Sequence, residues 1–193
     1  MKRICVFCGS SSGNNPVFAE AARSLGKQIA EHNSQLVFGA GKVGLMGLLA
    51  DAVLAHGGKV IGVIPDFLWE KEVGHTDLTE LHVVDSMHIR KQKMAALADG
   101  FIAMPGGFGT LEELAEILTW VQLDLIKKPV GLLNVNGFYS TFLQQLDHMV
   151  EMGFLKPQNR QLIIEITDPE TAIDQLKNYT FDDFSIWDKL DKT

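Results

Sequence analysis

The sequence predicts an α/β protein built as three layers, with a doubly wound parallel sheet between two layers of helices. Short apolar runs rich in Val, Ile and Leu alternate along the chain with longer stretches of helical periodicity. Such strands are buried on both faces, and right-handed crossovers place helices on both sides of the sheet. Three strand-to-helix turns are rich in glycine, which lets backbone approach a ligand at the carboxyl edge of the sheet. The expected fold is therefore Rossmann-like.

Strands are predicted at the short apolar runs, residues 3–8, 35–38, 59–64, 81–84, 101–104, 130–134 and 162–166. Helices are predicted between them, at residues 16–31, 45–56, 87–98, 111–125, 139–152 and 169–176. Pro16 opens the first helix, Gly57 and Gly58 close the second, and Pro129 follows the fourth. Residues 67–80 form the one long polar connection, of a type that often acts as a lid or binding segment.

The length and net charge of the chain limit its domain count and the partners it can bind. A chain of 193 residues favours one domain, residues 1–193, with residues 178–193 as a tail that packs along the surface or against a partner chain. The formal charge of -7 (17 basic minus 24 acidic side chains) argues against general binding to nucleic acid or anionic membranes. The N-terminal apolar run is too short for a signal peptide, and none reaches the roughly 20 residues of a membrane span. We expect a cytoplasmic protein.

The cysteines and histidines predict no metal site. Cys5 and Cys8 spell C-x-x-C, but on a strand this separation points the two side chains to opposite faces. Neither a second cysteine pair nor a suitably spaced pair among the six histidines completes a zinc set. We interpret both cysteines as buried thiols.

The stretch from Met104 to Glu113 carries the clearest functional signal. It follows an apolar strand, contains one proline and three glycines, and leads into a helix. A bare loop at a helix N-terminus presents backbone N–H groups and the positive end of the helix dipole, which together favour an anion such as phosphate. We expect phosphate on the segment Gly107–Thr110, with the Glu113 carboxylate beside it.

Two interpretations of Glu113 are open. Thr110 and Glu113 form the pattern Thr-x-x-Glu, which at a helix start makes a capping box where the glutamate only bonds the N-cap amide. The alternative is a functional carboxylate, which needs a second group nearby.

Arg90 is the candidate for that second group. In the predicted helix 87–98, for which Ser86 is the expected N-cap, Arg90 shares an otherwise apolar stripe with Met87 and Met94. It also lies near the first turn, where a cation opposes the helix dipole. A cation in this place indicates that an anion or carboxylate faces it; the alternative is a guanidinium that reaches into water.

A second glycine pattern leaves another function class open. Residues 39–44 match the dinucleotide fingerprint G-x-G-x-x-G after a strand and before a helix. The acidic residue expected at the end of the next strand is missing, since that strand ends in Ile64 and Pro65 with Asp66 beyond. A dinucleotide-dependent oxidoreductase is therefore only an alternative, and the P-loop pattern is absent.

The segment Pro105–Glu113 resembles the P-G-G-x-G-T-x-x-E signature of the LOG (Lonely Guy) proteins. Residues 87–91, Met-His-Ile-Arg-Lys, are similar to their second motif, and Gly41–Gly47 resembles their G-x-x-G-L-M-G loop. The similarity continues through Thr119 and residues 128–134, and covers nearly the whole chain up to about Ile166. The chain is identified as a member of this family, whose proteins have a Rossmann-like fold and usually form homodimers.

The resemblance implies an activity. LOG proteins are known as cytokinin riboside 5′-monophosphate phosphoribohydrolases, long mislabelled lysine decarboxylases. They cleave the N-glycosidic bond of a purine nucleoside 5′-monophosphate into free base and ribose 5-phosphate, and many bacterial members also act on AMP. The resemblance implies no cofactor, and nothing in the sequence marks a Schiff-base lysine for pyridoxal phosphate. A nucleotide-binding sensor without catalysis is the other alternative.

The resemblance also implies roles for individual residues. The family's catalytic arginine and glutamate correspond to Arg90 and Glu113, and Glu72 resembles a glutamate that contacts the base or sugar. The full predicted substrate-binding set is Glu72, Arg90, Lys91, Gly106, Gly107, Phe108, Gly109, Thr110, Glu112, Thr119, Gly9, Ser10, Gly41, Gly44 and Met87. Relatives usually have three glycines at residues 39–41, and Ala40 is expected to be tolerated there if its φ is negative.

These residues predict a mechanism and an assembly. Departure of the base leaves an oxocarbenium-like sugar, which a carboxylate at Glu113 stabilises while it activates water or attacks C1′. Arg90 is expected to orient Glu113 and the ribose, and to keep the carboxylate ionised because a close opposite charge lowers its pKa. The predicted helix 111–125 is apolar nearly all round, which favours burial against both the sheet and a second subunit in a homodimer.

Overall fold

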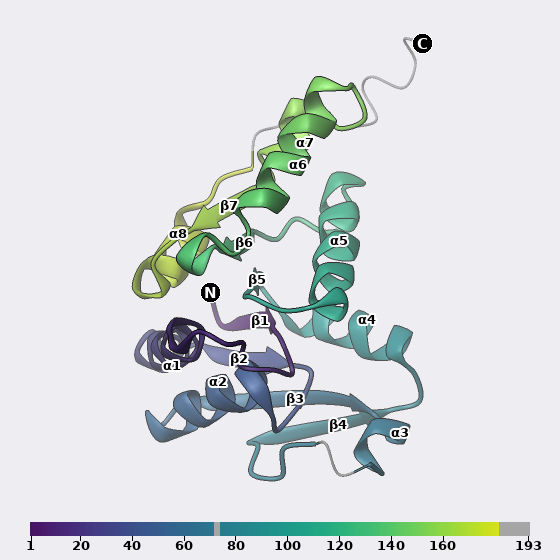
Figure 1. Ribbon diagram of the computed structural model, residues 1–193. Helices are drawn as coiled ribbons and strands as arrows, with labels where there is room; N and C mark the ends of the chain where they lie inside the picture. The colour runs from purple at the N-terminus through teal and green to yellow at the C-terminus, as the bar shows by residue number, and fades with distance from the viewer. Residues whose placement is uncertain (72–73, 182–193) are drawn as a thin grey trace.

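A parallel sheet of seven strands runs through the computed structural model, which describes residues 1–71 and 74–181 (Figure 1). The strand order is β4-β3-β2-β1-β5-β6-β7, and each neighbouring pair is parallel. The strands are β1 (Arg3–Phe7), β2 (Gln35–Phe38), β3 (Lys59–Pro65), β4 (Glu80–Val84), β5 (Gly100–Ala103), β6 (Val130–Leu133) and β7 (Ile163–Ile166). The order reverses at β1, so the topological switch point lies between β1 and β5.

Helices cover both faces of this sheet. One core contains α1 (Pro16–Glu31), α2 (Gly44–Ala55) and α8 (Ala172–Asn178), and the other contains α4 (Met87–Leu97), α5 (Phe108–Gln122) and α6 (Ser140–Glu151). In Figure 1, α1 and α2 accordingly lie across the sheet from α4 and α5. The three-layer, doubly wound α/β fold is confirmed. Within the described ranges, no helix is both long and apolar enough to cross a membrane.

The pleat of β1 divides its side chains between the two cores. Ile4, Val6 and Cys8 pack with α1 and α2, whereas Cys5 and Phe7 pack with α4 and α5. Both cysteines are free and buried, on opposite faces of the sheet as the sequence predicts.

Capping side chains set two of the helix starts. Asn15 accepts a hydrogen bond from the Val17 N–H at 3.1 Å, and Pro16 occupies the first position of α1. Ser86 Oγ accepts one from the Ile89 N–H at 3.3 Å, which confirms the predicted N-cap of α4. Because this cap fixes where α4 begins, it also places Arg90 in the first turns of the helix.

Some predicted boundaries were wrong. Two short helices, α3 (Asp66–Trp69) and α7 (Pro157–Arg160), were not predicted, and α3 occupies part of the polar connection. The last predicted helix divides into a 3-10 helix, η2 (Pro169–Thr171), and the α-helix α8. Another short 3-10 helix, η1 (Val135–Gly137), follows β6. In the predicted tail, Phe181 packs against the core formed by α4, α5 and α6. Glu72 and tail residues 182–193 lie outside the described residues.

Ala40 has a φ of +57°, so the condition on which its tolerance was predicted, a negative φ, is not met. The left-handed conformation costs a non-glycine residue roughly 1–2 kcal/mol. The Ala40 carbonyl accepts the His75 N–H at 2.8 Å, and its methyl is fully buried against Gly62, where a Cβ would lie 2.7 Å away. These contacts hold the alanine in a conformation that glycine would adopt without strain.

Candidate active site

A cavity of about 320 Å³ opens where β1 and β2 end, beside the N-terminus of α5. This is the switch-point edge, at which ligands bind in sheets of this type. Ten of the predicted site residues line it: Gly9, Ser10, Met87, Arg90, Gly107, Phe108, Gly109, Thr110, Glu112 and Glu113. Six other lining residues were not predicted as site residues, namely Val6, Phe7, Cys8, Gly39, Met46 and Met94.

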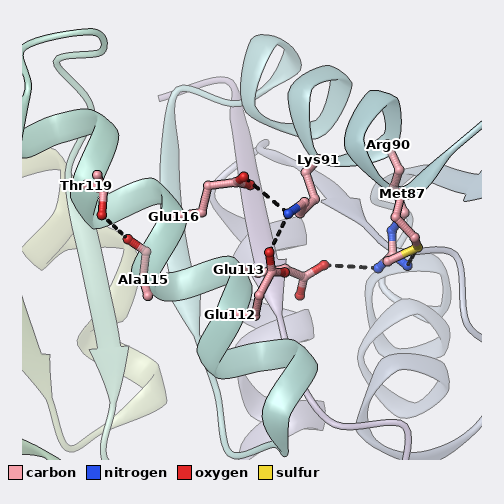
Figure 2. Close-up of polar contacts among 8 residues, drawn as sticks. All are labelled: Met87, Arg90, Lys91, Glu112, Glu113, Ala115, Glu116 and Thr119. Carbon is pink, nitrogen blue, oxygen red and sulfur yellow. Dashed lines mark hydrogen bonds and ion pairs between the residues drawn. The ribbon is translucent and has the colours of Figure 1, made fainter.

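Arg90 and Glu113 form a buried ion pair in this cavity (Figure 2). Arg90 Nη2 donates to Glu113 Oε1 at 3.1 Å, and the side chains are only 11% and 9% exposed. Arg90 Nη1 lies 3.7 Å from Met87 Sδ, and Nε is buried with no hydrogen-bond partner among the described residues. The guanidinium therefore faces a carboxylate, as its position on the apolar stripe indicates, and its buried Nε–H is unsatisfied among the described residues.

The start of α5 excludes the capping box. The helix begins at Phe108 with Gly107 as its N-cap, and no side chain caps it. Thr110 and Glu113 consequently lie inside the helix, too far along it to act as an N-cap and its partner, so the capping interpretation was wrong. The first backbone N–H groups of α5 have no intrahelical partner and lie at the cavity wall.

The glycine turn before α5 and the G-x-G-x-x-G turn after β2 differ in what an added side chain would contact. A Cβ at Gly107 or Gly109 has no atom within 4 Å, so the packing of the chain itself does not require glycine there. A Cβ at Gly41 would lie 2.6 Å from Met46 Cε, and one at Gly44 would overlap the backbone of Ser10. The α5 turn thus leaves room for a ligand, whereas the G-x-G-x-x-G turn is filled by the protein. This difference disfavours a dinucleotide at residues 39–44.

Gly39 makes room for the catalytic candidate Arg90. A Cβ on Gly39 would overlap Nη2 of Arg90 and lie 2.9 Å from its Cζ. The absence of a side chain here therefore lets the guanidinium lie against the end of β2. In the sequence, Gly39 is visible only as a glycine directly after a central strand. The reason that glycine is needed there is the side chain of Arg90, 51 positions further along the chain.

The comparisons with known proteins agree with these motifs. A family profile described as "Possible lysine decarboxylase" matches residues 46–176. A cytokinin riboside 5′-monophosphate phosphoribohydrolase of Arabidopsis thaliana is 48% identical over 197 residues, which cover 99% of this chain and 90% of that protein. The enzyme of the same name from Oryza sativa subsp. japonica, LOG, is 46% identical over 189 residues, with coverage of 97% and 78%. The chain belongs to the LOG family.

Solved structures resemble this LOG-family chain at lower identity. The molybdenum cofactor binding protein of Rippkaea orientalis has a TM-score of 0.69 at 23% identity, with 92% of this chain and 96% of that chain covered. The Moco carrier protein of Chlamydomonas reinhardtii has a TM-score of 0.68 at 23% identity, with coverage of 91% and 95%. At this identity the likeness concerns the fold alone.

Burial raises the pKa of Glu113 to about 7 in this LOG-family site. Arg90 opposes the shift and Glu112 adds to it, with smaller effects of Lys91 and Glu116 in opposite directions. Arg90 thus lowers the pKa as expected, but removal of the carboxyl from water outweighs this one ion pair, so the expectation that Glu113 is kept ionised was wrong. Near neutral pH both protonation states are populated, as suits a group that exchanges protons.

Lys91 does not line the cavity. Its buried ammonium donates to Glu112 and, at 3.1 Å, to Glu116, and so joins α4 to α5 (Figure 2). Burial lowers the pKa of Lys91, but the hydrogen bonds and charges of the two carboxylates outweigh this and the net shift is upward. In the structure Lys91 therefore holds Glu112 at the cavity wall.

Four further members of the predicted set lie away from the cavity wall. Thr119 Oγ1 donates to the Ala115 carbonyl at 2.8 Å on an exposed flank of α5, apart from the ion pair (Figure 2). Gly106 lies behind Thr110, whose side chain a Cβ at residue 106 would overlap. Gly41 and Gly44 belong to the filled turn after β2 described above.

The family profile's description implies pyridoxal phosphate, which forms a Schiff base with a lysine. The described residues that line the cavity include no lysine, and the neighbouring Lys91 is held by two carboxylates. The residues do not fit this cofactor. The described part of the chain also contains no group of three His, Cys, Asp or Glu placed to hold a metal.

Proposed function

We propose that the chain hydrolyses the N-glycosidic bond of purine ribonucleoside 5′-monophosphates, of the cytokinin type or AMP, to free base and ribose 5-phosphate. One observation carries this proposal: the buried Arg90–Glu113 pair lies within the same cavity as an open, uncapped helix N-terminus. The names of the Arabidopsis and rice relatives support the same reaction.

The α5 N-terminus is the proposed phosphate site. Its N–H groups at Phe108, Gly109 and Thr110 and the helix dipole favour an anion, and the lack of a side chain at Gly107 and Gly109 leaves space for it. Glu113 follows one turn later on the same helix. A 5′-phosphate bound at this turn therefore directs the attached ribose toward the carboxyl group.

The proposed reaction is a hydrolysis. The bond between C1′ and the base nitrogen breaks, and the electron pair leaves with the base, which takes up a proton. The ionised Glu113 stabilises the oxocarbenium-like sugar and removes a proton from the attacking water, or it attacks C1′ itself to form a glycosyl ester that water then hydrolyses. Arg90 holds Glu113 in place through the hydrogen bond from Nη2. Met46, Met94 and Phe7 supply apolar surface for the purine ring.

The proposed assembly is a homodimer that covers the exposed flank of α5. Leu123 and Leu125 are 38% and 65% exposed beyond the end of this helix, and Leu111 and Leu118 are half-buried on it. A second copy placed here would remove these side chains from water. Such a copy would also cover Thr119, which is exposed and does not line the cavity of its own chain.

The deciding experiment incubates the purified protein with AMP, isopentenyladenosine 5′-monophosphate, CMP and UMP, and resolves the products by chromatography. We expect free adenine or isopentenyladenine together with ribose 5-phosphate, and no release of pyrimidine. A ligand-dependent rise in melting temperature without free base would indicate a sensor instead. Reduction of NAD(P) would indicate the oxidoreductase alternative.

Gly109→Ala is expected to affect stability and function in opposite directions. The methyl meets nothing in the protein, and alanine is favoured over glycine in a helix by about 0.5–1 kcal/mol, so the melting temperature rises. The methyl also occupies the proposed phosphate space, so KM for AMP rises. Calorimetry and steady-state kinetics measure the two effects. A variant that is stabilised but has an unchanged KM would contradict the proposal that the phosphate binds at this turn.

The pH profile of kcat/KM is expected to rise through a midpoint near 7. The reaction uses ionised Glu113, whose pKa burial raises to about 7, so activity increases with pH as the carboxyl loses its proton. Glu112 contributes to this raised pKa, and Glu112→Gln should therefore shift the midpoint to lower pH. Initial rates from pH 5 to 9 measure both midpoints. A wild-type profile that is flat from pH 5 to 8 would exclude Glu113 as the titrating group.

A further inference from the structure

Tyr139 lies behind the cavity wall and reaches the phosphate turn from the other half of the sheet. Its side chain is almost completely buried, and its hydroxyl donates to the Met104 carbonyl at 2.7 Å. Met104 is the first residue past β5 and precedes Pro105, where the glycine turn begins. A side chain 35 residues further along the chain thus bonds the backbone directly before the turn that is proposed to hold phosphate.

The position of the Tyr139 hydroxyl is itself fixed by contacts. The Tyr139 N–H donates to Asn134 Oδ1 at 2.7 Å, and Asn134 Nδ2 donates to Glu165 Oε1, also at 2.7 Å. The aromatic ring packs edge-on against Phe138 and Phe142, with centroid distances of 4.8 and 6.1 Å. These contacts come from the segment after β6 and from β7, so the C-terminal part of the sheet determines where the hydroxyl lies.

The anchored segment connects onward to the other loops of the site. The Pro105 carbonyl accepts the Gly9 N–H at 3.0 Å, and the Gly9 carbonyl accepts the Leu45 N–H at 3.1 Å. A shift of the Met104 carbonyl would therefore move the α5 turn relative to the loop after β1. Burial and the neighbouring Cys8 raise the pKa of Tyr139, so the phenol keeps its proton and remains a donor.

We propose that Tyr139 is a positioning residue that holds the Met104–Gly107 segment in the geometry that binds the 5′-phosphate. It contacts the carbonyl that leads into the turn and does not line the cavity. The inference rests on the proposed function for the identity of the anion. It adds a residue outside the signature motif to those that determine phosphate affinity.

Tyr139→Phe removes the hydroxyl and leaves the ring in place, and Phe142→Leu is the matched packing control because it disturbs the same aromatic cluster without touching Met104. Binding of ribose 5-phosphate and of adenosine is measured by titration calorimetry, with amide NMR shifts of Gly107 and Gly109 as a local readout. In Tyr139→Phe we expect ribose 5-phosphate to bind roughly 3- to 10-fold more weakly, the range that loss of one buried hydrogen bond produces. Adenosine affinity should stay unchanged. Phe142→Leu should lower the melting temperature and leave both affinities at wild-type values.

The kinetic readout separates positioning from general damage. For Tyr139→Phe we expect KM for AMP to rise by the same factor with kcat nearly unchanged, because the lost hydroxyl bonds the Met104 carbonyl and takes no part in the Arg90–Glu113 pair. Equal ribose 5-phosphate affinity in Tyr139→Phe and wild type, or equal weakening of adenosine and ribose 5-phosphate, would overturn the inference. If the wild type itself fails to bind ribose 5-phosphate, the proposed phosphate site fails and the inference with it. Binding without turnover of AMP would contradict only the proposed hydrolysis.

Discussion

Glu113→Gln is expected to lower kcat for release of base from AMP by about 10²- to 10⁴-fold, the contribution typical of a positioned acid–base group. The amide oxygen can still accept from Arg90 Nη2, so the cavity keeps its shape while the negative charge is lost. Chromatography of free adenine under single-turnover conditions measures the effect. Turnover near the wild-type rate would show that Glu113 is not the reacting carboxylate.

Glu116→Gln is the matched control for this change. Glu116 lies one turn further along α5, bonds Lys91 at 3.1 Å and does not line the cavity. Glu116→Gln removes one negative charge from the same helix as Glu113→Gln does, and we expect its activity to stay close to wild type.

Glu113→Gln should also change how the free energy of unfolding depends on pH. The folded state raises the pKa of Glu113 from 4.5 to about 7, so it prefers the protonated carboxyl. The stability this group contributes is fully present below pH 4.5 and is lost as the pH rises through about 7. Over this window the loss is on the order of 3 kcal/mol. Denaturant unfolding at pH 5 and 8 should show this loss in the wild type and not in Glu113→Gln.

Gly39→Ala is expected to reduce activity by about 10²-fold or more without contact between residue 39 and the reacting atoms. The new methyl would overlap Arg90 Nη2, so the guanidinium moves away from Glu113. A displacement of about 1 Å in a catalytic group is enough for such a loss. Because Arg90 also opposes the rise in the Glu113 pKa, the midpoint of the pH profile should move upward.

A double-mutant cycle tests this cause. If the methyl acts only through the guanidinium, Gly39→Ala should have no further effect on kcat/KM in an Arg90→Ala background. Melting temperatures of all four proteins show whether each is folded. Additive losses in the double variant would place the effect of Gly39 elsewhere, for example in the backbone of the turn after β2.

The sequence predicted those features of the site that depend on short-range pattern. Ser86 could be recognised as the cap of α4 from neighbouring residues, and Arg90 was anomalous within its own helix, both on the apolar stripe and near the positive end of the dipole. The glycines of residues 106–109 indicated the turn before α5 in the same way. Each of these signals spans fewer than ten residues.

Features that depend on how helices pack were missed or misjudged. Lys91 lies next to Arg90 in sequence, but the placement of α5 against α4 gives it two carboxylate partners and removes it from the cavity wall. The pKa of Glu113 was expected to fall because only the opposite charge was visible in the sequence. The depth at which the carboxyl lies is a property of the packed structure, and it outweighs that charge.

By itself, the sequence determined the strands, the two layers of helices, the glycine turn before α5 and the anomalous place of Arg90 in its helix, because periodicity, caps and turns act between neighbours in the chain. Only the tertiary structure decided which glycines are open to a ligand, where α5 begins, and which distant side chains hold the site in place. Gly39 and Tyr139 act on groups 51 and 35 residues away, at Arg90 and Met104. Such contacts exist only after the sheet has brought the carboxyl ends of its strands together.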